Sequence, residues 1–486
     1  MVFSSLTFLH IFLPCVLLIY YSTLVVMRRQ GRVSMLPLNV VLLAVSLLFY
    51  IWGEGGRCTV LLALAGISYG GALYLAPLGD GQSRRFQQLL LTLVICSEFA
   101  FLFYYKYSGF ISNVLPEGDF SSRLQAWTAG VTLPLGISFF TFQTISYAID
   151  VYRGEVQPSK SPLNYLTYVT LFPHLVAGPI VRYETLQVEL TERSHTIAKF
   201  ASGVRRFILG LGKKVLIANM LSIPADQAFS DPTQLSRGMA WIGLVAYSLQ
   251  LYFDFSGYSD MAIGLARMFG FEFPENFRAP YSATSVTDFW RRWHLSLSTW
   301  FRDYLYIPLG GNRKGQFRTI FNLLIVFALC GFWHGANWTF LIWGLYHGLF
   351  LILERLLPAK ATQPGGRWGM LWTLPIVMVG WLIFRSNSME DVSHYLQAMW
   401  GGSTATSTRP MSMPDLNVIL AFLAAVTLCI PRVEEIVRGE NVRLQLWQPI
   451  QGLAHTTCIA AYVAVFVAST NCLMVRMNNP FIYYRF

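Results

Sequence analysis

Long apolar runs separated by short polar links dominate this chain. A membrane-spanning helix needs about 20 mostly apolar residues, and many of the runs reach that length. They lie at residues 6–27, elsewhere within 28–105, and at 131–154, 238–253, 319–354, 368–385, 415–431 and 451–474. The pattern predicts one polytopic membrane domain with about ten to twelve transmembrane or re-entrant segments, almost all helical. Loops are expected at 107–128 and at 386–414, and the second loop could meet a partner.

Two segments depart from the simple spanning pattern. Residues 164–183 are apolar but contain Pro173, Gly178 and Pro179. Backbone hydrogen bonds cannot be left open in lipid, so this segment is expected to be re-entrant or packed inside protein. Residues 197–215 combine an apolar stripe at helical spacing with lysine and arginine that lie largely off the stripe. This pattern favours an amphipathic helix at the cytoplasmic membrane surface, with a site for an anionic ligand as the alternative.

The run between Arg318 and Glu354 is too long to be one span. Its 35 residues would measure about 52 Å as a single helix, against a hydrocarbon core of about 30 Å. A break is therefore expected, and Gly331 and Gly335 mark the place. His334 lies at this break, and an ionisable group at membrane depth indicates a functional residue. The alternative is a neutral histidine bonded to a carbonyl group within the helix bundle.

A second polar interruption occurs in residues 285–315. Ser285 and Asp288 have the spacing of a capping box, which predicts a helix that starts near Thr287. Aromatic side chains form one broad face of this helix, and its charged residues lie mostly elsewhere. Because such a helix is too polar to span lipid freely, we expect it to be interfacial or re-entrant. It carries His294 into the membrane region, either as a functional group or as an interfacial histidine with a hydrated ring.

Composition and charge agree with a membrane protein and exclude one class of partner. Hydrophobic residues make up 54% of the chain and charged residues only 13%, whereas soluble domains contain about 25% charged residues. The net charge is +11, and basic clusters at 28–32 and 82–88 place those short loops in the cytoplasm. The N-terminus and the loop at 107–128 are then expected outside. A nucleic-acid partner is not expected, because no basic stripe with interleaved aromatic residues is present.

Neither the cysteines nor the histidines form a pattern typical of a metal site. Most of the seven cysteines lie within apolar runs and none forms a CxxC pair, so they are interpreted as small hydrophobic residues. His334 and His347 are 13 residues apart, which places them about 140° apart around a straight helix. No catalytic metal is therefore predicted.

Several motifs, ordered along nearly the whole chain, resemble the membrane-bound O-acyltransferase family. They include "PLGISFFTFQTISYAIDVYRG" (134–154), "FPHLVAGPIVRY" (172–183), "DFWRRWHLSLSTWFRDYLYIPLGGNRKG" (288–315) and "GFWHGANWTFLIWGLYHG" (331–348). The sequence is similar specifically to the bacterial branch that acetylates secreted polysaccharides. The resemblance implies a fold of many helices around a buried reaction chamber. We expect N-terminal spans at 1–130, a catalytic core at 131–354 and C-terminal spans at 355–486.

The resemblance also implies roles for individual residues. His334, which matches the family's membrane histidine, would be catalytic, and His294 would be the second functional histidine. The implied acetyl donor is acetyl-CoA from the cytoplasm, used as a substrate and not as a bound cofactor. Arg302, Arg313 and Lys314 are candidate contacts to its phosphates. The excess of positive charge on cytoplasmic loops explains these three residues without a ligand as well.

These features favour an enzyme that moves acetyl across the bacterial inner membrane for O-acetylation of an exopolysaccharide, with alginate and cellulose as the leading candidates. A periplasmic acetyltransferase or carrier protein is the expected partner. His334 is predicted to take the hydroxyl proton, since histidine has a pKa of about 6.5, near operating pH. His294 would bind or polarise a carbonyl or pass the proton, and Asn337 would orient His334 or simply pack. A transporter or a non-catalytic scaffold of a polysaccharide synthesis complex is the competing interpretation.

Overall fold

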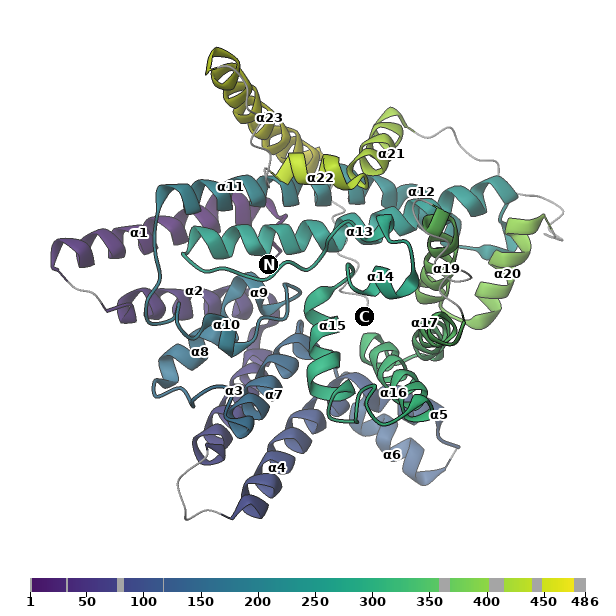
Figure 1. Cartoon of the computed structure of the whole chain (residues 1–486), viewed down its shortest axis with the longest axis horizontal. Coiled ribbons are helices and arrows are strands. Elements are labelled where there is room, and N and C mark those ends of the chain that lie inside the picture. Colours follow the sequence, from purple (N-terminus) through teal and green to yellow (C-terminus); the bar gives the residue numbers. More distant parts are fainter. Residues whose placement is uncertain are drawn as a thin grey trace. The chain divides into compact units, whose positions relative to one another are not determined.

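The computed structural model describes residues 2–31, 34–76, 83–116, 118–357, 368–401, 415–438 and 448–475. Within these ranges every regular element is a helix (Figure 1). Eight helical stretches there are long and apolar enough to cross a membrane, or nine if the bent pair α21 (Leu416–Leu428) and α22 (Pro431–Arg438) forms one span. The prediction of an all-helical polytopic membrane protein is thereby confirmed.

The chain divides into two compact units, and each is described by itself. Unit 1 contains residues 1–204 and 262–274, and unit 2 contains residues 205–261 and 275–486. Two long helices, α11 (Ile197–Gly212) and α13 (Arg237–Met268), have residues in both units. The other elements of unit 1 are η1 (Phe8–Phe12), α1 (Leu13–Arg29), α2 (Leu36–Glu54), η2 (Gly55–Arg57), α3 (Cys58–Leu75), α4 (Arg84–Leu102), η3 (Phe103–Tyr107), α5 (Ser108–Val114), α6 (Asp119–Thr128), α7 (Ile137–Arg153), α8 (Pro162–Thr170), α9 (Phe172–Leu175) and α10 (Tyr183–Leu186).

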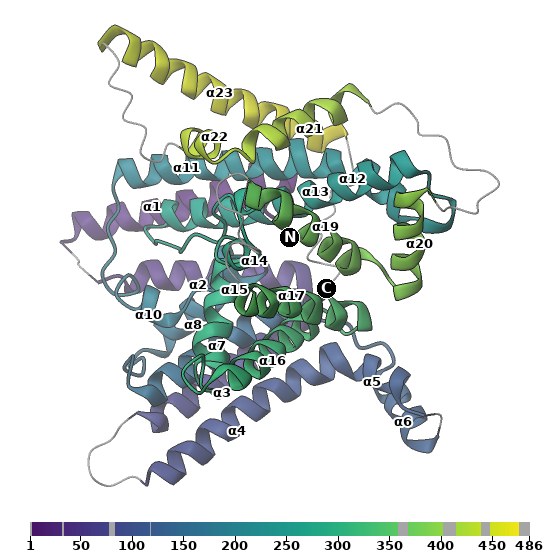
Figure 2. The same cartoon turned by 45° about the vertical axis from the view of Figure 1, so that its right-hand side comes forward.

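Unit 1 packs α3, α4 and α7 against one another (Figure 2). The apolar segment at 164–183 is broken as expected, because Leu171 separates α8 from the single turn α9, and a turn followed by irregular backbone at 176–182 separates α9 from α10. Ser161 caps α8 by accepting a hydrogen bond from the backbone N–H of Asn164 at 3.2 Å. The loop predicted at 107–128 is wrong in part, since this stretch forms the short helices α5 and α6.

Unit 2 contains the remaining helices. Besides its parts of α11 and α13 they are η4 (Lys213–Ala218), α12 (Asn219–Phe229), η5 (Pro232–Gln234), η6 (Pro280–Ser282), α14 (Val286–Trp290), α15 (Leu295–Phe301), η7 (Arg302–Tyr306), α16 (Gln316–His334), α17 (Trp338–Leu356), α19 (Trp368–Arg385), α20 (Met389–Trp400), α21, α22 and α23 (Gln448–Val475). The predicted spans at 368–385, 415–431 and 451–474 correspond to α19, α21 and α23. Helix α20 lies in the predicted loop 386–414, where Ser388 and Asp391 form a capping box that the sequence analysis missed.

Basic side chains of α11 and η4 are buried in unit 2. Arg206 and Lys213, 3% and 6% exposed, each form an ion pair with Asp260 of α13, at 2.6 and 2.8 Å. Lys214, 2% exposed, pairs with Asp254 at 2.5 Å. The predicted basic face is therefore wrong at Arg206, Lys213 and Lys214, whose side chains are buried and paired, whereas the location of α11 at the membrane surface stays a prediction. The carboxylates that neutralise these cations belong to α13, so the pattern within α11 could not reveal them.

A close approach of α11 and α13 in unit 2 accompanies these ion pairs. A Cβ atom on Gly210 would lie 2.5 Å from the carbonyl oxygen of Gly257, so only glycine lets the two backbones come this near. Close contacts between small residues are typical of helix packing in membranes, where apolar side chains gain little by leaving lipid. The short distance between the helices lets basic side chains of one reach carboxylates of the other.

Breaking the pair between Lys214 and Asp254 should destabilise the protein. Asp254→Leu leaves a buried ammonium group without its carboxylate, and loss of one partner of a buried pair costs about 3–5 kcal/mol. We expect a clearly lower Tm in detergent, measured by intrinsic fluorescence. The double variant Asp254→Leu/Lys214→Met should recover part of the loss, because no unpaired charge remains. Strictly additive losses would contradict a direct pairing.

Candidate active site

The predicted break in the long apolar run is confirmed, and His334 lies at it. Helix α16 ends at His334 and α17 begins at Trp338. The two helices lie side by side in both views (Figures 1 and 2). The apolar run therefore folds as a helical hairpin with the histidine at its turn.

Glycines allow this hairpin to close. A Cβ atom on Gly331 would lie 2.2 Å from the carbonyl oxygen of Phe340, and one on Gly335 would lie 2.2 Å from the ring of Phe340. Gly335 has a φ of −162°, which is extended backbone that any residue adopts. The two glycines are therefore needed for the close approach of α17, and not for an unusual backbone conformation.

Aromatic rings surround His334. Its side chain is 6% exposed, and its ring centroid lies 4.9 Å from Trp333, 5.1 Å from Trp343 and 5.3 Å from Phe384. These rings come from α16, α17 and α19. In such apolar surroundings charges interact more strongly than in water, so a proton transfer here is sensitive to nearby polar groups. Asn337 is expected from the sequence to orient His334 or to pack. Its side-chain amide donates a hydrogen bond to the backbone carbonyl of Asn387 at 3.1 Å.

His294 lies where the predicted aromatic helix is interrupted. Ser285 caps α14 by accepting from the N–H of Asp288 at 3.0 Å, so the predicted helix start is correct to within one residue. The chain then turns at His294, and α15 begins at Leu295. His294 has φ 45° and ψ 55°, a left-handed conformation that costs a residue with a Cβ atom about 1–2 kcal/mol. Strain of this kind at a buried histidine indicates a functional position.

An extended segment holds His294 in this conformation. The carbonyl of Asn276 accepts a hydrogen bond from the N–H of Leu295 at 3.0 Å, and the carbonyl of Arg292 accepts from the N–H of Arg278 at 3.0 Å. The side-chain oxygen of Asn276 lies 3.2 Å from Nδ1 of His294. Backbone pairing on both sides of the histidine therefore offsets the cost of its left-handed conformation.

The His294 imidazole is buried among aromatic rings. It is 1% exposed, and its ring centroid lies 4.6 Å from that of Phe255, edge to face. Burial favours the neutral form of this imidazole, because the protein excludes the water that would stabilise the charged ring.

The two predicted histidines lie at one aromatic cluster in unit 2. The ring of Phe277 lies 6.4 Å from His294 and 5.0 Å from Trp293. The ring of Trp293 lies 4.8 Å from Trp381. Trp381 lies 6.0 Å from Trp343, which in turn contacts His334. The structure thus connects both histidines through aromatic rings that are almost completely buried.

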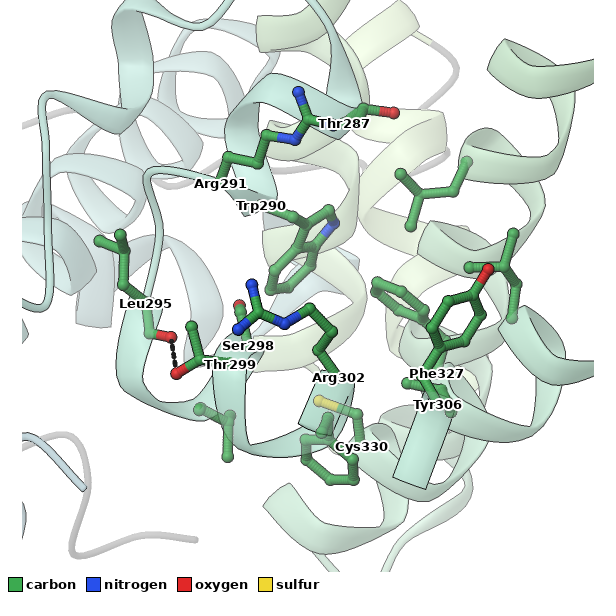
Figure 3. A pocket seen from close by; sticks show the side chains of 15 residues that line it. Thr287, Trp290, Arg291, Leu295, Ser298, Thr299, Arg302, Tyr306, Phe327 and Cys330 are labelled. Carbon is green, nitrogen blue, oxygen red and sulfur yellow. Dashed lines mark hydrogen bonds between the residues drawn. The ribbon is translucent and has the colours of Figure 1, made fainter. Parts of the chain in front are cut away.

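A cavity of about 490 Å³ lies beside both histidine-bearing segments (Figure 3). Its lining includes Leu295, the residue after His294, and Cys330, one helical turn before His334. Neither histidine is among the lining side chains. The lining is mostly apolar and is contributed by α14, α15, η7, α16 and α17. A flexible, mainly apolar group that enters this cavity would therefore contact Leu295 and Cys330, which lie close to His294 and His334 in the chain.

Two exposed arginines, Arg291 and Arg302, line the same cavity. Figure 3 shows the guanidinium group of Arg302 near the Trp290 ring and that of Arg291 beside Thr287. Arg302 also pairs with Asp303 at 2.6 Å. Of the three predicted phosphate contacts, the structure brings only Arg302 to the cavity lining, whereas Arg313 and Lys314 are exposed in the link between η7 and α16. The sequence did not identify Arg291 as a cavity residue, because its position on the helix does not show which other helices pack around it.

Glu354 is a further residue that sequence reasoning used only as the end of an apolar run. Its carboxylate accepts hydrogen bonds from the N–H of Val286 at 2.6 Å, the N–H of Thr287 at 2.8 Å and the hydroxyl of Thr287 at 2.7 Å. A carboxylate is favourable at a helix start, where backbone N–H groups lack partners. Glu354 of α17 thereby fixes the first turn of α14, which carries Trp290 and Arg291 toward the cavity.

Within the described residues no group of three or more His, Cys, Asp or Glu side chains is arranged to hold a metal ion. The chemistry available at the site comes from two buried imidazoles, a mostly apolar cavity and two arginines. This combination suits transfer of a group between a bound anionic donor and a hydroxyl, with histidine moving the proton.

Comparison with known proteins relates this chain to enzymes that transfer acyl groups. The sequence model of the membrane-bound O-acyltransferase family matches residues 86–359. A probable alginate O-acetylase from Pseudomonas putida is 40% identical over the whole length of both chains. A peptidoglycan O-acetyltransferase from Helicobacter pylori is 34% identical over 82% of this chain and 80% of its own. A teichoic acid D-alanyltransferase from Bacillus subtilis is 30% identical over 51% of this chain and 68% of its own.

Glu354 should be required for the shape of the cavity. In Glu354→Ala the first turn of α14 loses three hydrogen bonds to a carboxylate, which we expect to lower the free energy of unfolding by about 2–4 kcal/mol. Thermal unfolding in detergent and the alkylation rate of Cys330 in the folded state measure the two effects. The matched control is Glu390→Gln, which removes an acid from α20 and should leave both readouts unchanged. Unaltered stability and Cys330 reactivity in Glu354→Ala would contradict this role.

Proposed function

The chain belongs to the membrane-bound O-acyltransferase family and is an acyltransferase of the membrane, and we propose that it transfers acetyl from cytoplasmic acetyl-CoA for O-acetylation of a secreted exopolysaccharide. The observation that carries this proposal is the similarity to an alginate O-acetylase over the full length of both chains. Alginate is the first candidate for the polymer and cellulose the second. The bacterial inner membrane is the proposed location, because polymer export and acetyl-CoA meet there.

We propose that His334 takes the proton of the acceptor hydroxyl. In the reaction the hydroxyl oxygen bonds to the acetyl carbon, the carbon–sulfur bond breaks, and the proton ends on the departing sulfur. Because the apolar surroundings of His334 exclude water, the attacking oxygen has few competing nucleophiles there. His294 assists, either by binding a carbonyl oxygen or by carrying the proton. The catalytic core at 131–354 stays a prediction, as does the set of spans on either side of it.

The cavity beside the two histidines is the proposed entry for the donor. Its volume of about 490 Å³ and its apolar lining suit the pantetheine arm, which ends in the thioester. Arg302 and Arg291 are placed to pair with phosphates outside the cavity, and guanidinium groups form strong charge-assisted bonds to phosphate. Arg313 and Lys314 remain candidates for phosphates farther from the thioester.

The donor and the polymer lie on opposite sides of the membrane. Acetyl must therefore cross while coenzyme A stays in the cytoplasm, and a histidine reachable from both sides would permit this. We propose that a periplasmic acetyltransferase or carrier protein receives the acetyl group and passes it to the polymer. The peptidoglycan O-acetyltransferase among the relatives makes a cell-wall acceptor the alternative to an exopolysaccharide.

Replacement of His334 tests the proposed reaction. His334→Ala should lower transfer of labelled acetyl from acetyl-CoA to the isolated polymer by about 100-fold or more, since a positioned base contributes about 10²–10⁴-fold. Membrane insertion and Tm should stay close to wild type. The control His394→Ala removes a histidine of α20 and should retain full transfer. Normal acetylation in His334→Ala cells, with labelled polymer, would refute the role of this residue.

The two arginines at the cavity provide a test of donor binding. Arg291→Ala and Arg302→Ala should each raise KM for acetyl-CoA by about tenfold, as expected for loss of one charged contact of about 1.4 kcal/mol. The kcat should change less, because neither guanidinium is close to the thioester in this arrangement. Arg237→Ala, at the exposed start of α13, is the control. If KM is unchanged in both variants, the donor enters elsewhere.

A further inference from the structure

The side chain of Asn276 makes several polar contacts at the turn that contains His294. The Asn276 side chain is completely buried. Its oxygen Oδ1 accepts hydrogen bonds from the N–H of Ser296 at 3.2 Å and from the hydroxyl of Ser296 at 2.9 Å, and it lies 3.2 Å from Nδ1 of His294. At the other end of the amide, Nδ2 donates to the hydroxyl of Ser259 at 3.2 Å. One amide group therefore organises the residues around the left-handed turn.

The backbone N–H of Ser296 determines the orientation of the Asn276 amide. A backbone N–H can only donate a hydrogen bond, so the atom of Asn276 that faces the N–H of Ser296 must be the oxygen. The same oxygen faces Nδ1 of His294. The opposite end of the amide is then the NH₂ group, which agrees with its contact to the hydroxyl of Ser259.

The position of the imidazole proton follows from this orientation. The hydroxyl of Ser296 also lies 3.5 Å from Nδ1, but its one hydrogen is donated to the Asn276 oxygen at 2.9 Å. Because an amide oxygen only accepts, Nδ1 of His294 must carry a hydrogen to form the contact. A neutral imidazole has one N–H, which leaves Nε2 with a lone pair. The ring is 1% exposed, and burial away from water favours the neutral form of an imidazole. In this form Nε2 can accept a proton or a hydrogen bond but cannot donate one.

We propose that Asn276 is a positioning residue that fixes His294 in the Nδ1–H tautomer, so that His294 acts in acetyl transfer as a proton acceptor at Nε2 and not as a donor to the reacting carbonyl. This inference rests on the proposed function, which places His294 in the reaction. It decides between the two roles left open for His294, because polarisation of a carbonyl needs an N–H at Nε2.

The proton balance of the reaction agrees with this role. Acetyl transfer forms one carbon–oxygen bond, breaks one carbon–sulfur bond and moves one proton from the hydroxyl oxygen to the departing sulfur. His294 at rest has no proton at Nε2 to give, but it can hold this proton in transit and return it to the sulfur. The ring ends each cycle in the tautomer in which it began, with Nδ1 bonded to Asn276 throughout.

Nitrogen NMR tests the tautomer without any reaction. Wild-type protein labelled with ¹⁵N-histidine would be reconstituted in bilayers at pH 7, and the His294 signals assigned by their absence in His294→Gln. We expect a protonated, pyrrole-type nitrogen at Nδ1 and an unprotonated, pyridine-type nitrogen at Nε2. In Asn276→Leu the proton should redistribute toward Nε2. A wild-type spectrum with the proton on Nε2 overturns the proposal.

Kinetics of matched variants test the consequence for catalysis. Asn276→Leu keeps the approximate shape but has no acceptor, and kcat should fall about 100-fold or more, as for other histidines released into the wrong tautomer. The KM for acetyl-CoA should stay within about twofold, because the donor cavity is not altered.

Asn276→Asp keeps an oxygen opposite Nδ1 and should retain most of the activity. As the pH is lowered, the rate of this variant should begin to decline at a higher pH than that of wild type. The reason is that a carboxylate raises the pKa of the neighbouring imidazole.

Ser259→Ala is the control for these variants. It removes the hydroxyl that accepts from Asn276 and leaves the contact to His294 in place, so kcat should stay near wild type. The proposal is overturned if Asn276→Leu loses no more kcat than Ser259→Ala. It is also overturned if Asn276→Asp loses as much as Asn276→Leu with an unshifted pH profile, which is the result of a structural role alone. Should Asn276→Leu not fold, the NMR spectrum of the wild type and the pH profile of Asn276→Asp still decide.

The outcomes separate this inference from the proposed function. A wild-type protein with the expected tautomer that transfers no acetyl from acetyl-CoA would refute the proposed function and leave the assignment of Asn276 standing. Acetyl transfer that depends on His334, together with a His294 proton on Nε2, would support the proposed function and refute the assignment of Asn276.

Discussion

Polar groups inside a bilayer need partners within the protein, because neither lipid nor bulk water can satisfy them there. This requirement explains the parts of unit 2 that surround the candidate site. Arg206, Lys213 and Lys214 are buried only because α13 supplies carboxylates to each of them. The start of α14 is buried because Glu354 of α17 accepts from its N–H groups. The buried start of α14 and the buried cations of α11 and η4 thus each have a partner from another helix.

The same requirement explains why both candidate histidines lie at breaks. His334 ends α16, where Gly331 and Gly335 let α17 fold back closely enough to enclose it. His294 occupies a left-handed turn that pairing with the segment around Asn276 holds in place. A helix interior would point a histidine at one neighbouring face only, whereas a break can present the ring to a chamber reached by several helices. The aromatic cluster then excludes water from both rings.

Comparison of the two histidines shows how differently the protein supports them. Rings from three helices surround His334. His294 is fixed by a polar side chain whose own orientation is set by a backbone N–H. The first arrangement suits a residue at which a nucleophile must be kept from water. The second suits a residue whose protonation state must be the same at the start of each cycle.

The sequence by itself determined the class of fold, the break at His334 and the broken segment at 164–183, because these features depend on local hydrophobicity and span length. The ordered motifs made His334 and His294 the candidate residues. It could not place the basic side chains of α11, since their carboxylate partners are remote in sequence. Nor could it find Arg291, Asn276 or Glu354, because each has a role only through residues of another segment. It interpreted residues 386–414 as a loop because their composition is polar, and so missed the capping box of α20. Tertiary structure decided which polar groups are buried and which partners satisfy them, since burial and pairing depend on distances between segments that no local pattern encodes.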